Sequence, residues 1–189
     1  YTTDSNILRF VITTNPNQGD VNFRLGFFNM STGNMELENG TVLGSERITR
    51  EVLPVIVPKD GEKSQRLLDV AVTDRMETII AYSTFTDEFD CDYRVARWSN
   101  GNLDVDNLVS AGMPFFHSSK YVGGIAFGYD KNELYLSRED DNIWHIEKWS
   151  TTDQVNWSMD ERLHTSKEGH VAIRPILEKD GDKILWHEG

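Results

Sequence analysis

The sequence has almost no cysteine and no long hydrophobic run. Cys91 is the only cysteine in 189 residues, so these residues can form neither an internal disulfide nor a zinc site built on several cysteines. Its acidic neighbours Asp90 and Asp92 disfavour the thiolate form and therefore a reactive thiol. Apolar residues come in short runs, none as long as a transmembrane helix. These absences favour a folded globular chain without a helical membrane span.

Positive charge is also scarce. The chain carries 19 lysines and arginines against 31 aspartates and glutamates, a net charge of −12. Nucleic acids and anionic membranes are therefore not expected partners, because their phosphates would be repelled. Solubility is the simpler explanation of such an acidic surface. An acidic ligand would have to be held by arginines gathered locally.

Amphipathic helical patterns and a signal-peptide pattern are both missing. No stretch shows an apolar period of 3.6 residues over a convincing length, whereas alternating or short apolar runs bounded by Gly, Asn, Asp and Pro recur throughout. Any targeting segment is expected to have been removed or to lie outside these residues. Strands are predicted at residues 7–13, 21–28, 52–57, 67–73, 78–85, 93–98, 103–109, 124–127, 133–138, 144–149, 157–163, 171–177 and 183–186.

These strands fall into cycles. The first strand of each cycle is centred near Arg9, Asp69, Ile125 and Ile173, at intervals of 60, 56 and 48 residues. Four antiparallel strands joined by tight polar turns form one blade of a β-propeller. We therefore predict one all-β propeller domain or propeller portion, with blades at about 1–63, 64–112 and 113–168 and an incomplete blade at 169–189.

The incomplete last cycle bears on how the ring would close. An open propeller would leave sheet edges that can pair with other chains. Three blades and a fraction would close poorly, so we expect this chain to form part of a larger ring. The remaining blades would lie on the same chain or on another chain.

Several segments together resemble a known family. They are Leu68-Asp-Val-Ala, Asp92-Tyr-Arg-Val-Ala-Arg-Trp98, Tyr121-Val-Gly-Gly-Ile, Leu134-Tyr-Leu-Ser-Arg-Glu139, Trp144-His-Ile-Glu-Lys-Trp-Ser-Thr-Thr-Asp153, Arg174-Pro175 and Leu185-Trp-His-Glu-Gly189. In this order they are similar to the secreted β-propellers with BNR repeats, which include ulvan lyases and related polysaccharide lyases. The resemblance implies an extracellular or cell-surface protein that acts on an acidic polysaccharide.

Two segments depart from the family pattern. Residues 151–157 resemble an Asp-box turn, but Val155 stands in place of its central glycine and the loop is one residue shorter. Asn15 precedes Pro16 where catalytic members carry a histidine. The second departure favours a propeller that binds glycans without cleaving them.

The resemblance also assigns candidate catalytic residues. Polysaccharide lyases remove the proton next to a uronate carboxylate, which requires a base and a group that neutralises the carboxylate. Tyr121 takes the position of the base and Arg138 that of the neutralising group. His117 is a candidate second base or substrate contact. The alternatives are that Tyr121 is a buried aromatic residue, that Arg138 pairs with Glu139 or Asp140, and that His117 is an ordinary loop histidine.

Two further residues are candidates for substrate binding. Arg174 precedes Pro175 in a first strand, which would line the central channel, where a guanidinium could hold a carboxylate or sulfate. It could equally pair with an acid on a neighbouring blade. Tyr135 is the second candidate. Arg94 and Arg97 are expected to be structural, and repeated tryptophans are expected to pack between blades, namely Trp144, Trp149 and Trp157.

No cofactor is expected. The histidines outside the candidate site show no metal-ligand spacing, and nothing in the sequence indicates a structural metal ion. Neither a Gly-rich phosphate loop nor a serine nucleophile elbow is present.

The leading hypothesis is therefore an extracellular lyase-like propeller that carries out β-elimination on a uronate-containing polysaccharide. The alternative is a non-catalytic glycan-binding or structural propeller of a cell surface or phage tail. A sialidase-type glycosidase, which needs paired carboxylates and an arginine triad, stays open as a third reading.

Overall fold

The computed structural model describes residues 2–4, 6–14, 21–46, 48–61, 63–87, 90–113, 122–178 and 183–189. Within these residues the chain forms four antiparallel sheets, and a single 3-10 turn at Arg50–Val52 is the helical structure found there. The prediction of an all-β chain is confirmed.

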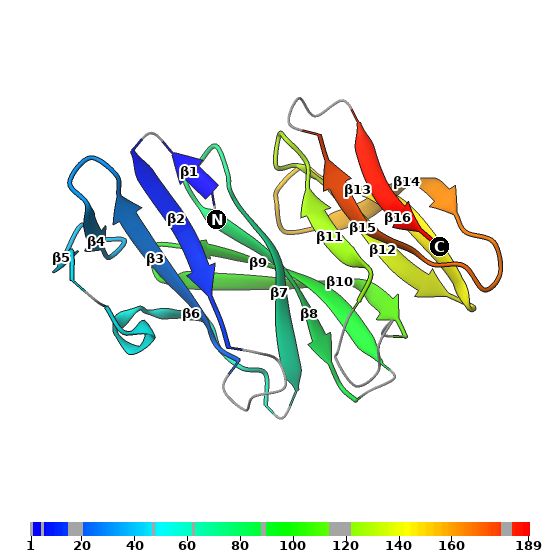
Figure 1. Cartoon of the computed structure of the whole chain (residues 1–189), viewed down its shortest axis with the longest axis horizontal. Helices are drawn as coiled ribbons and strands as arrows, with labels where there is room; N and C mark the ends of the chain where they lie inside the picture. Colours follow the sequence, from blue (N-terminus) through cyan, green and yellow to red (C-terminus); the bar gives the residue numbers. More distant parts are fainter. Residues whose placement is uncertain are drawn as a thin grey trace.

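The sheets follow one another along the chain, from blue to red in Figure 1. The first runs in the order β1-β2-β3-β4-β5, and β6 also pairs with β3; its strands are β1 (Thr2–Asp4), β2 (Ile7–Ile12), β3 (Phe23–Asn29), β4 (Asn34–Glu36), β5 (Val42–Gly44) and β6 (Val55–Val57). The second runs in the order β10-β9-β8-β7, with β7 (Ser64–Val72), β8 (Thr78–Phe85), β9 (Cys91–Ser99) and β10 (Asn102–Gly112).

The third and fourth sheets complete the described part of the chain. The third runs in sequence order through β11 (Gly124–Phe127), β12 (Glu133–Asp140), β13 (Ile143–Thr151) and β14 (Trp157–Thr165). The fourth is a pair of strands, β15 (Ala172–Leu177) and β16 (Ile184–Glu188). In the second and third sheets each strand pairs with the next strand in sequence, which is the connectivity of a propeller blade.

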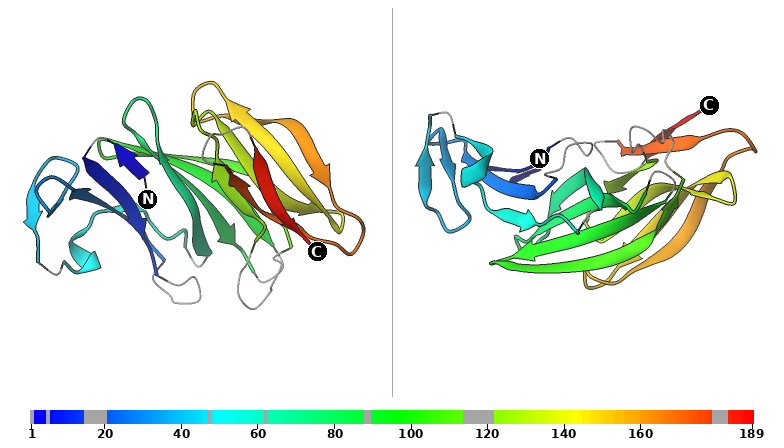
Figure 2. Two further views of the ribbon diagram at one scale, coloured as in Figure 1. Left: turned by 45° about the horizontal axis from the view of Figure 1, so that its top comes forward. Right: turned by 90° about the horizontal axis from the view of Figure 1, so that it is seen from below.

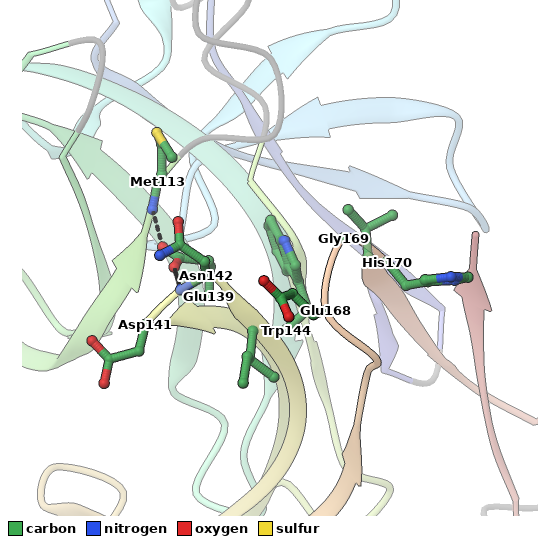
Figure 3. Close-up of a pocket in the computed structure, with 10 residues that line it drawn as sticks. Met113, Glu139, Asp141, Asn142, Trp144, Glu168, Gly169 and His170 are labelled. Atoms are coloured by element: carbon green, nitrogen blue, oxygen red, sulfur yellow. Dashed lines mark hydrogen bonds between the residues drawn. The ribbon is translucent and has the colours of Figure 1, made fainter.

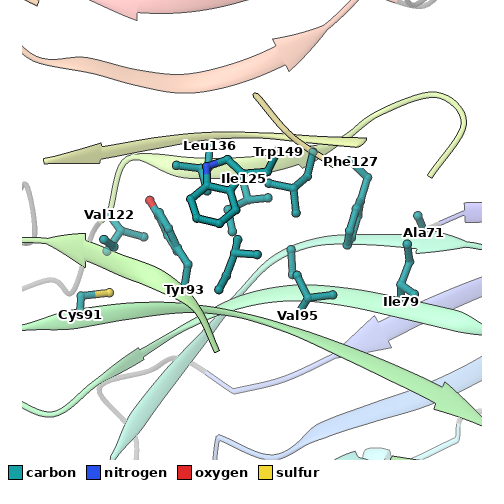
Figure 4. Close-up of a cluster of buried hydrophobic side chains, with 14 of the residues drawn as sticks. Ala71, Ile79, Cys91, Tyr93, Val95, Val122, Ile125, Phe127, Leu136 and Trp149 are labelled. Atoms are coloured by element: carbon teal, nitrogen blue, oxygen red, sulfur yellow. The ribbon is translucent and has the colours of Figure 1, made fainter. Parts of the chain in front are cut away.

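Consecutive sheets stack face to face through apolar cores (Figure 2). The largest core lies between the second and third sheets and contains Tyr93, Val95, Leu136 and Trp149 (Figure 4). Separate clusters join the first sheet to the second and the third to the fourth. Burial of apolar surface between layers stabilises the stack at about 25 cal/mol per Å² removed from water.

Burial along the strands reflects this stacking. Every residue of β8 is buried, because alternate side chains such as Ile79 and Ile80 enter the two different cores on its two faces. In contrast, β14 is mostly exposed, since it is the outermost strand of its sheet. Trp144 and Trp149 belong to the cores on opposite faces of the third sheet, and Trp157 packs against the larger one. The prediction that the tryptophans pack between blades is confirmed.

The first sheet differs from the predicted four-stranded blade because it has six strands, three of them additional short strands, β1, β4 and β5. The strand predicted over residues 52–57 is also wrong in part. Val52 ends the 3-10 turn, and only Val55–Val57 form a strand, β6, which lies between Pro54 and Pro58. Proline lacks an N–H and cannot donate to a sheet ladder, so it limits β6 at both ends. Closure of a propeller ring stays a prediction.

Candidate functional site

A groove lies where the first strands of three successive sheets come together. Its volume is about 270 Å³, and it is formed by residues of β7, β11 and β15 and the segment just before β11. The lining residues are Arg66, Leu67, Leu68, Val122, Gly123, Gly124, Ile125, Arg174, Pro175 and Ile176. Two arginines therefore face a groove in a protein whose overall charge is strongly negative.

The two glycines of the groove are each required by their surroundings. A Cβ on Gly123 would lie 2.6 Å from both the Cβ and the carbonyl oxygen of Ser137. Gly124 has a φ of 115°, a conformation that residues with a Cβ rarely adopt. Together they let the start of β11 lie close to β12 on one side and to β15 on the other.

Arg174 has an unusual backbone conformation. Its φ is 58°, in the left-handed region, although it precedes Pro175, which favours extended geometry in the preceding residue. It lies where the register between β15 and β16 shifts, and its N–H donates to the carbonyl oxygen of Gly123 at 2.7 Å. Such a bulge redirects a side chain. Arg174 lies on β15, the first strand of the fourth sheet, and lines the groove; its predicted place in a central channel stays a prediction.

A chain of hydrogen bonds fixes the floor of the groove across three sheets. The fully buried hydroxyl of Tyr93 on β9 donates to the carbonyl oxygen of Ser137 at 2.6 Å and accepts from the N–H of Gly124 at 2.8 Å. The hydroxyl of Ser137 in turn donates to the carbonyl oxygen of Ala172 on β15. Burial raises the pKa of Tyr93 well above its usual value, so this hydroxyl stays protonated and acts as a structural bridge.

A partly buried carboxylate adds a further link between the first strands. Asp69 on β7 accepts hydrogen bonds from the N–H of Phe127 on β11 at 2.9 Å and from the N–H of Val70 at 2.8 Å. Burial raises the pKa of Asp69, while these two bonds act in the opposite direction. The first strands of the second and third sheets are thus held in a fixed relation.

Arg138 is bound by acids within its own sheet. Its Nε lies 3.0 Å from the carboxylate of the fully buried Glu147, and its Nη2 lies 3.1 Å from that of Asp140. Glu147 also accepts from Arg162 at 3.1 Å and from the indole N–H of Trp149 at 3.1 Å. Of the two acids named as alternative partners in the sequence analysis, Asp140 pairs with Arg138 and Glu139 instead accepts bonds from backbone N–H groups.

The other predicted site residues are placed as follows. The largely buried Tyr135 donates its hydroxyl to Glu133 at 3.0 Å, and it is not among the residues that line the groove. Tyr121, His117 and the turn at Asn15 and Pro16 lie outside the described residues, so their predicted roles stay predictions. Tyr121 directly precedes Val122, which lines the groove.

A larger cavity of about 600 Å³ lies beside the hairpin between β12 and β13 (Figure 3). Glu139 holds its rim together, because its carboxylate accepts from the N–H of Met113 at 3.0 Å and from the N–H of Asn142. The remaining lining residues are Asp141, Ile143, Trp144, Glu168, Gly169, His170 and Val171. The cavity and the groove lie at the same end of the sheets. The strands β12 and β14 end there, and β11 and β15 begin there.

Sequence reasoning missed Arg66 and the larger cavity. Arg66 precedes an apolar pair near the start of a first strand, much as Arg174 lies in the first strand of the fourth cycle, and that repetition could have identified it. The cavity has no such signal, because it combines three separate segments, namely Met113, the hairpin residues 139–144 and the loop residues 168–171.

The turn at residues 151–157 lies at the end of the strands opposite to the groove and the larger cavity, and its role is structural. Asp153 accepts from the N–H groups of Val155 and Asn156 at 2.9 and 2.8 Å, and also from the side chain of Asn156. These bonds, led by those from Asn156, hold the pKa of the Asp153 carboxyl far below its usual range. The Asp-box pattern thus closes a turn even though Val155 replaces the glycine.

In the described ranges, histidine, cysteine and acidic residues form no group of three that could hold a metal ion. The same ranges contain no helix with the length and apolar character of a membrane span.

Comparisons with known proteins give a structural likeness at low sequence identity. No family model and no curated protein matches the sequence. The fold is similar to that of an ulvan lyase of polysaccharide lyase family PL25, with a TM-score of 0.67 and 16% identity over 92% of this chain and 43% of that one. The same values hold for this lyase bound to a GlcA(1-4)Rha3S unit. A puromycin hydrolase matches with a TM-score of 0.51 and 14% identity, over 95% of this chain and 27% of that one.

These likenesses concern the fold. The chain spans less than half the length of the ulvan lyase that it matches. It shares with that protein an all-β arrangement of stacked antiparallel sheets.

Proposed function

We propose that this chain belongs to a protein that binds an acidic polysaccharide and cleaves it by β-elimination. The observation that carries the proposal is the groove with Arg66 and Arg174, at the meeting point of three first strands, in a fold similar to an ulvan lyase. Guanidinium groups recognise carboxylates with two parallel hydrogen bonds. A uronate carboxylate held in this way loses part of its charge, which makes the neighbouring proton easier to remove.

The neutralising role fits Arg174 better than Arg138. Arg138 pairs with Glu147 and Asp140 within its own sheet, and it is not among the residues that line the groove. Arg174 lines the groove from a redirected backbone position on β15, and Arg66 lines the same groove from β7. Tyr121 stays the proposed base and His117 the proposed second base or substrate contact. Both precede the groove residue Val122 in the sequence.

The second candidate is a propeller that binds glycans without cleaving them. It is favoured by Asn15, which stands at the position where the resemblance expects a histidine. Under this proposal the groove would hold a uronate, but no group would remove the proton.

We further propose a setting and an assembly for the protein. Polymeric glycans lie outside cells, so the site of action is proposed to be extracellular or at a cell surface. The fourth sheet has two strands within the described residues, whereas the second and third have four each. Further blades, on this or another chain, are proposed to complete the ring.

The decisive experiment is incubation of the purified protein with ulvan and other uronate polymers. Elimination creates an unsaturated sugar, which is followed by its ultraviolet absorbance. Tyr121→Phe should lower turnover by about 10²–10⁴-fold and leave binding intact, because it removes the base alone. Arg174→Ala should impair both binding and turnover, by about 10²-fold or more in turnover.

Arg50→Ala provides a matched control, because Arg50 pairs with the neighbouring Glu51 on the exposed surface of the first sheet, away from the groove. It should change neither property. Binding without any absorbance change would replace the lyase proposal with the glycan-binding one. Loss of neither binding nor turnover in Arg174→Ala would contradict the assignment of the groove.

A further inference from the structure

The larger cavity differs in charge from the groove lined by Arg66 and Arg174 (the arginine groove). Three carboxylates line it, from Glu139, Asp141 and Glu168, and no lysine or arginine is among its described lining residues. The buried side of the cavity includes Trp144, which is 7% exposed (Figure 3). Its volume of about 600 Å³ falls within the range of about 300–1,000 Å³ that small-molecule sites occupy.

The walls of this cavity are held in place before any ligand arrives. The backbone N–H groups of Met113 and Asn142 fix the carboxylate of Glu139. The backbone N–H of Trp144 donates to the hydroxyl of Ser166 at 3.1 Å. Asp141 and Asn142 adopt φ angles of 52° and 64°, which fixes a tight turn that Asp and Asn tolerate. Preformed polar groups of this kind can bind a hydroxyl-rich ligand with little loss of freedom.

The cavity and the groove are close enough for one ligand to enter both. Val171 lines the cavity and Arg174 lines the groove, and they are three positions apart along the chain, with two residues between them. An extended chain covers at most about 3.6 Å per residue, so their Cα atoms lie within about 11 Å of each other. Neighbouring sugar units of one polysaccharide can therefore contact sites of opposite charge.

We propose that this cavity binds an uncharged, hydroxyl-rich sugar unit next to the uronate, and that it disfavours sulfated or carboxylated units. The proposal rests on the proposed function and defines its substrate more narrowly, as a polysaccharide in which unsulfated neutral sugars alternate with uronates. Carboxylates accept hydrogen bonds from sugar hydroxyls, whereas a sulfate close to three carboxylates is repelled. Selectivity thus arises from a repulsive element as well as an attractive one.

The test compares two tetrasaccharides with the same uronate units, whose neutral sugars are either unsulfated or sulfated, by titration calorimetry. The unsulfated ligand should bind about tenfold more tightly. In the double variant Asp141→Asn/Glu168→Gln the ratio should fall to about threefold or less, because the sulfated ligand gains affinity. Asparagine keeps the turn at position 141, so the cavity retains its shape.

Glu46→Gln is the matched control, since it removes one exposed carboxylate from the bend that follows β5, and Glu46 does not line the cavity. It should leave the ratio unchanged. Equal binding of the two ligands by the unmodified protein, or a ratio that the double variant does not alter, would overturn this inference while the proposed function stands. Binding of neither ligand would overturn the proposed function as well.

Discussion

Gly123 and Ser137 show how single residues determine the shape of the groove. The side chain and carbonyl of Ser137 occupy the space that a Cβ at position 123 would need. The same hydroxyl donates to Ala172 on the next sheet, so it cannot move away without losing that bond. The glycine is therefore required for packing, and its neighbour Gly124 is required for its φ of 115°.

We expect Gly123→Ala to destabilise the protein by about 1–3 kcal/mol, the usual cost of overpacking a buried site. The new methyl group would push β12 or β15 away from β11 and widen the groove. Thermal or urea unfolding measures the first effect, and glycan affinity measures the second.

Ser137→Gly in the Gly123→Ala background is the matching rescue. It removes the Cβ and hydroxyl contacts but leaves the carbonyl contact, so recovery should be partial. If the single variant were as stable as the original protein, the close approach of β11 and β12 would be contradicted.

At the scale of elements, the short strand β11 depends on its neighbours. It has four residues, whereas the other three strands of its sheet have eight or nine. Its position is fixed from the second sheet by Tyr93 and Asp69, and from the fourth sheet by the bond between Arg174 and Gly123. The arginine groove is thus built from bonds between sheets more than from bonds within one.

Tyr93→Phe tests this dependence. The change leaves the buried carbonyl oxygen of Ser137 and the partly buried N–H of Gly124 without the hydroxyl that bridges them. We expect a loss of about 1–3 kcal/mol for each buried group left unpaired. Faster hydrogen exchange at Gly124 should accompany the loss of stability.

Tyr129→Phe removes a hydroxyl from a side chain that is 77% exposed, and it should change stability by at most about 0.5 kcal/mol. Equal effects of the two substitutions would contradict a bridging role for Tyr93.

At the scale of the whole molecule, the net charge opposes the proposed ligand. The chain carries a charge of −12, yet the groove for an acidic glycan needs only a few guanidinium groups close to the bound carboxylate. The repulsion acts over long distances, whereas the attraction acts at contact. Salt screens long-range interactions first, because the Debye length falls from about 30 Å at 0.01 M to about 8 Å at 0.15 M.

We therefore expect the association rate with a uronate polymer to rise several-fold as salt increases over this range. Basic glycan-binding proteins should show the opposite trend. Stopped-flow measurements on a fluorescent uronate oligosaccharide would test this, with an uncharged oligosaccharide as the reference. A rate that falls steadily with salt would mean that local attraction dominates even at long range.

The sequence by itself determined the strands and their order. Alternating apolar residues and turn dipeptides mark β8, β11 and β12 closely, because strand formation and turn chemistry are local. It also predicted that Trp144, Trp149 and Trp157 pack between sheets, since burial of large aromatic side chains stabilises the fold. The short strands β1, β4 and β5 escaped prediction, because three residues carry too little pattern.

Only the tertiary structure decided what the arginines do. The sequence places both Arg138 and Arg174 on predicted strands but does not show which groups lie next to them. Folding places Arg138 against the buried Glu147 and Arg174 in the groove beside Arg66. The larger cavity could likewise not be predicted from the sequence, because its residues come from separate segments that only the stacking of sheets brings together. Which carboxylate an arginine pairs with depends on distances between residues on different strands and sheets. The order of residues in the sequence does not contain those distances.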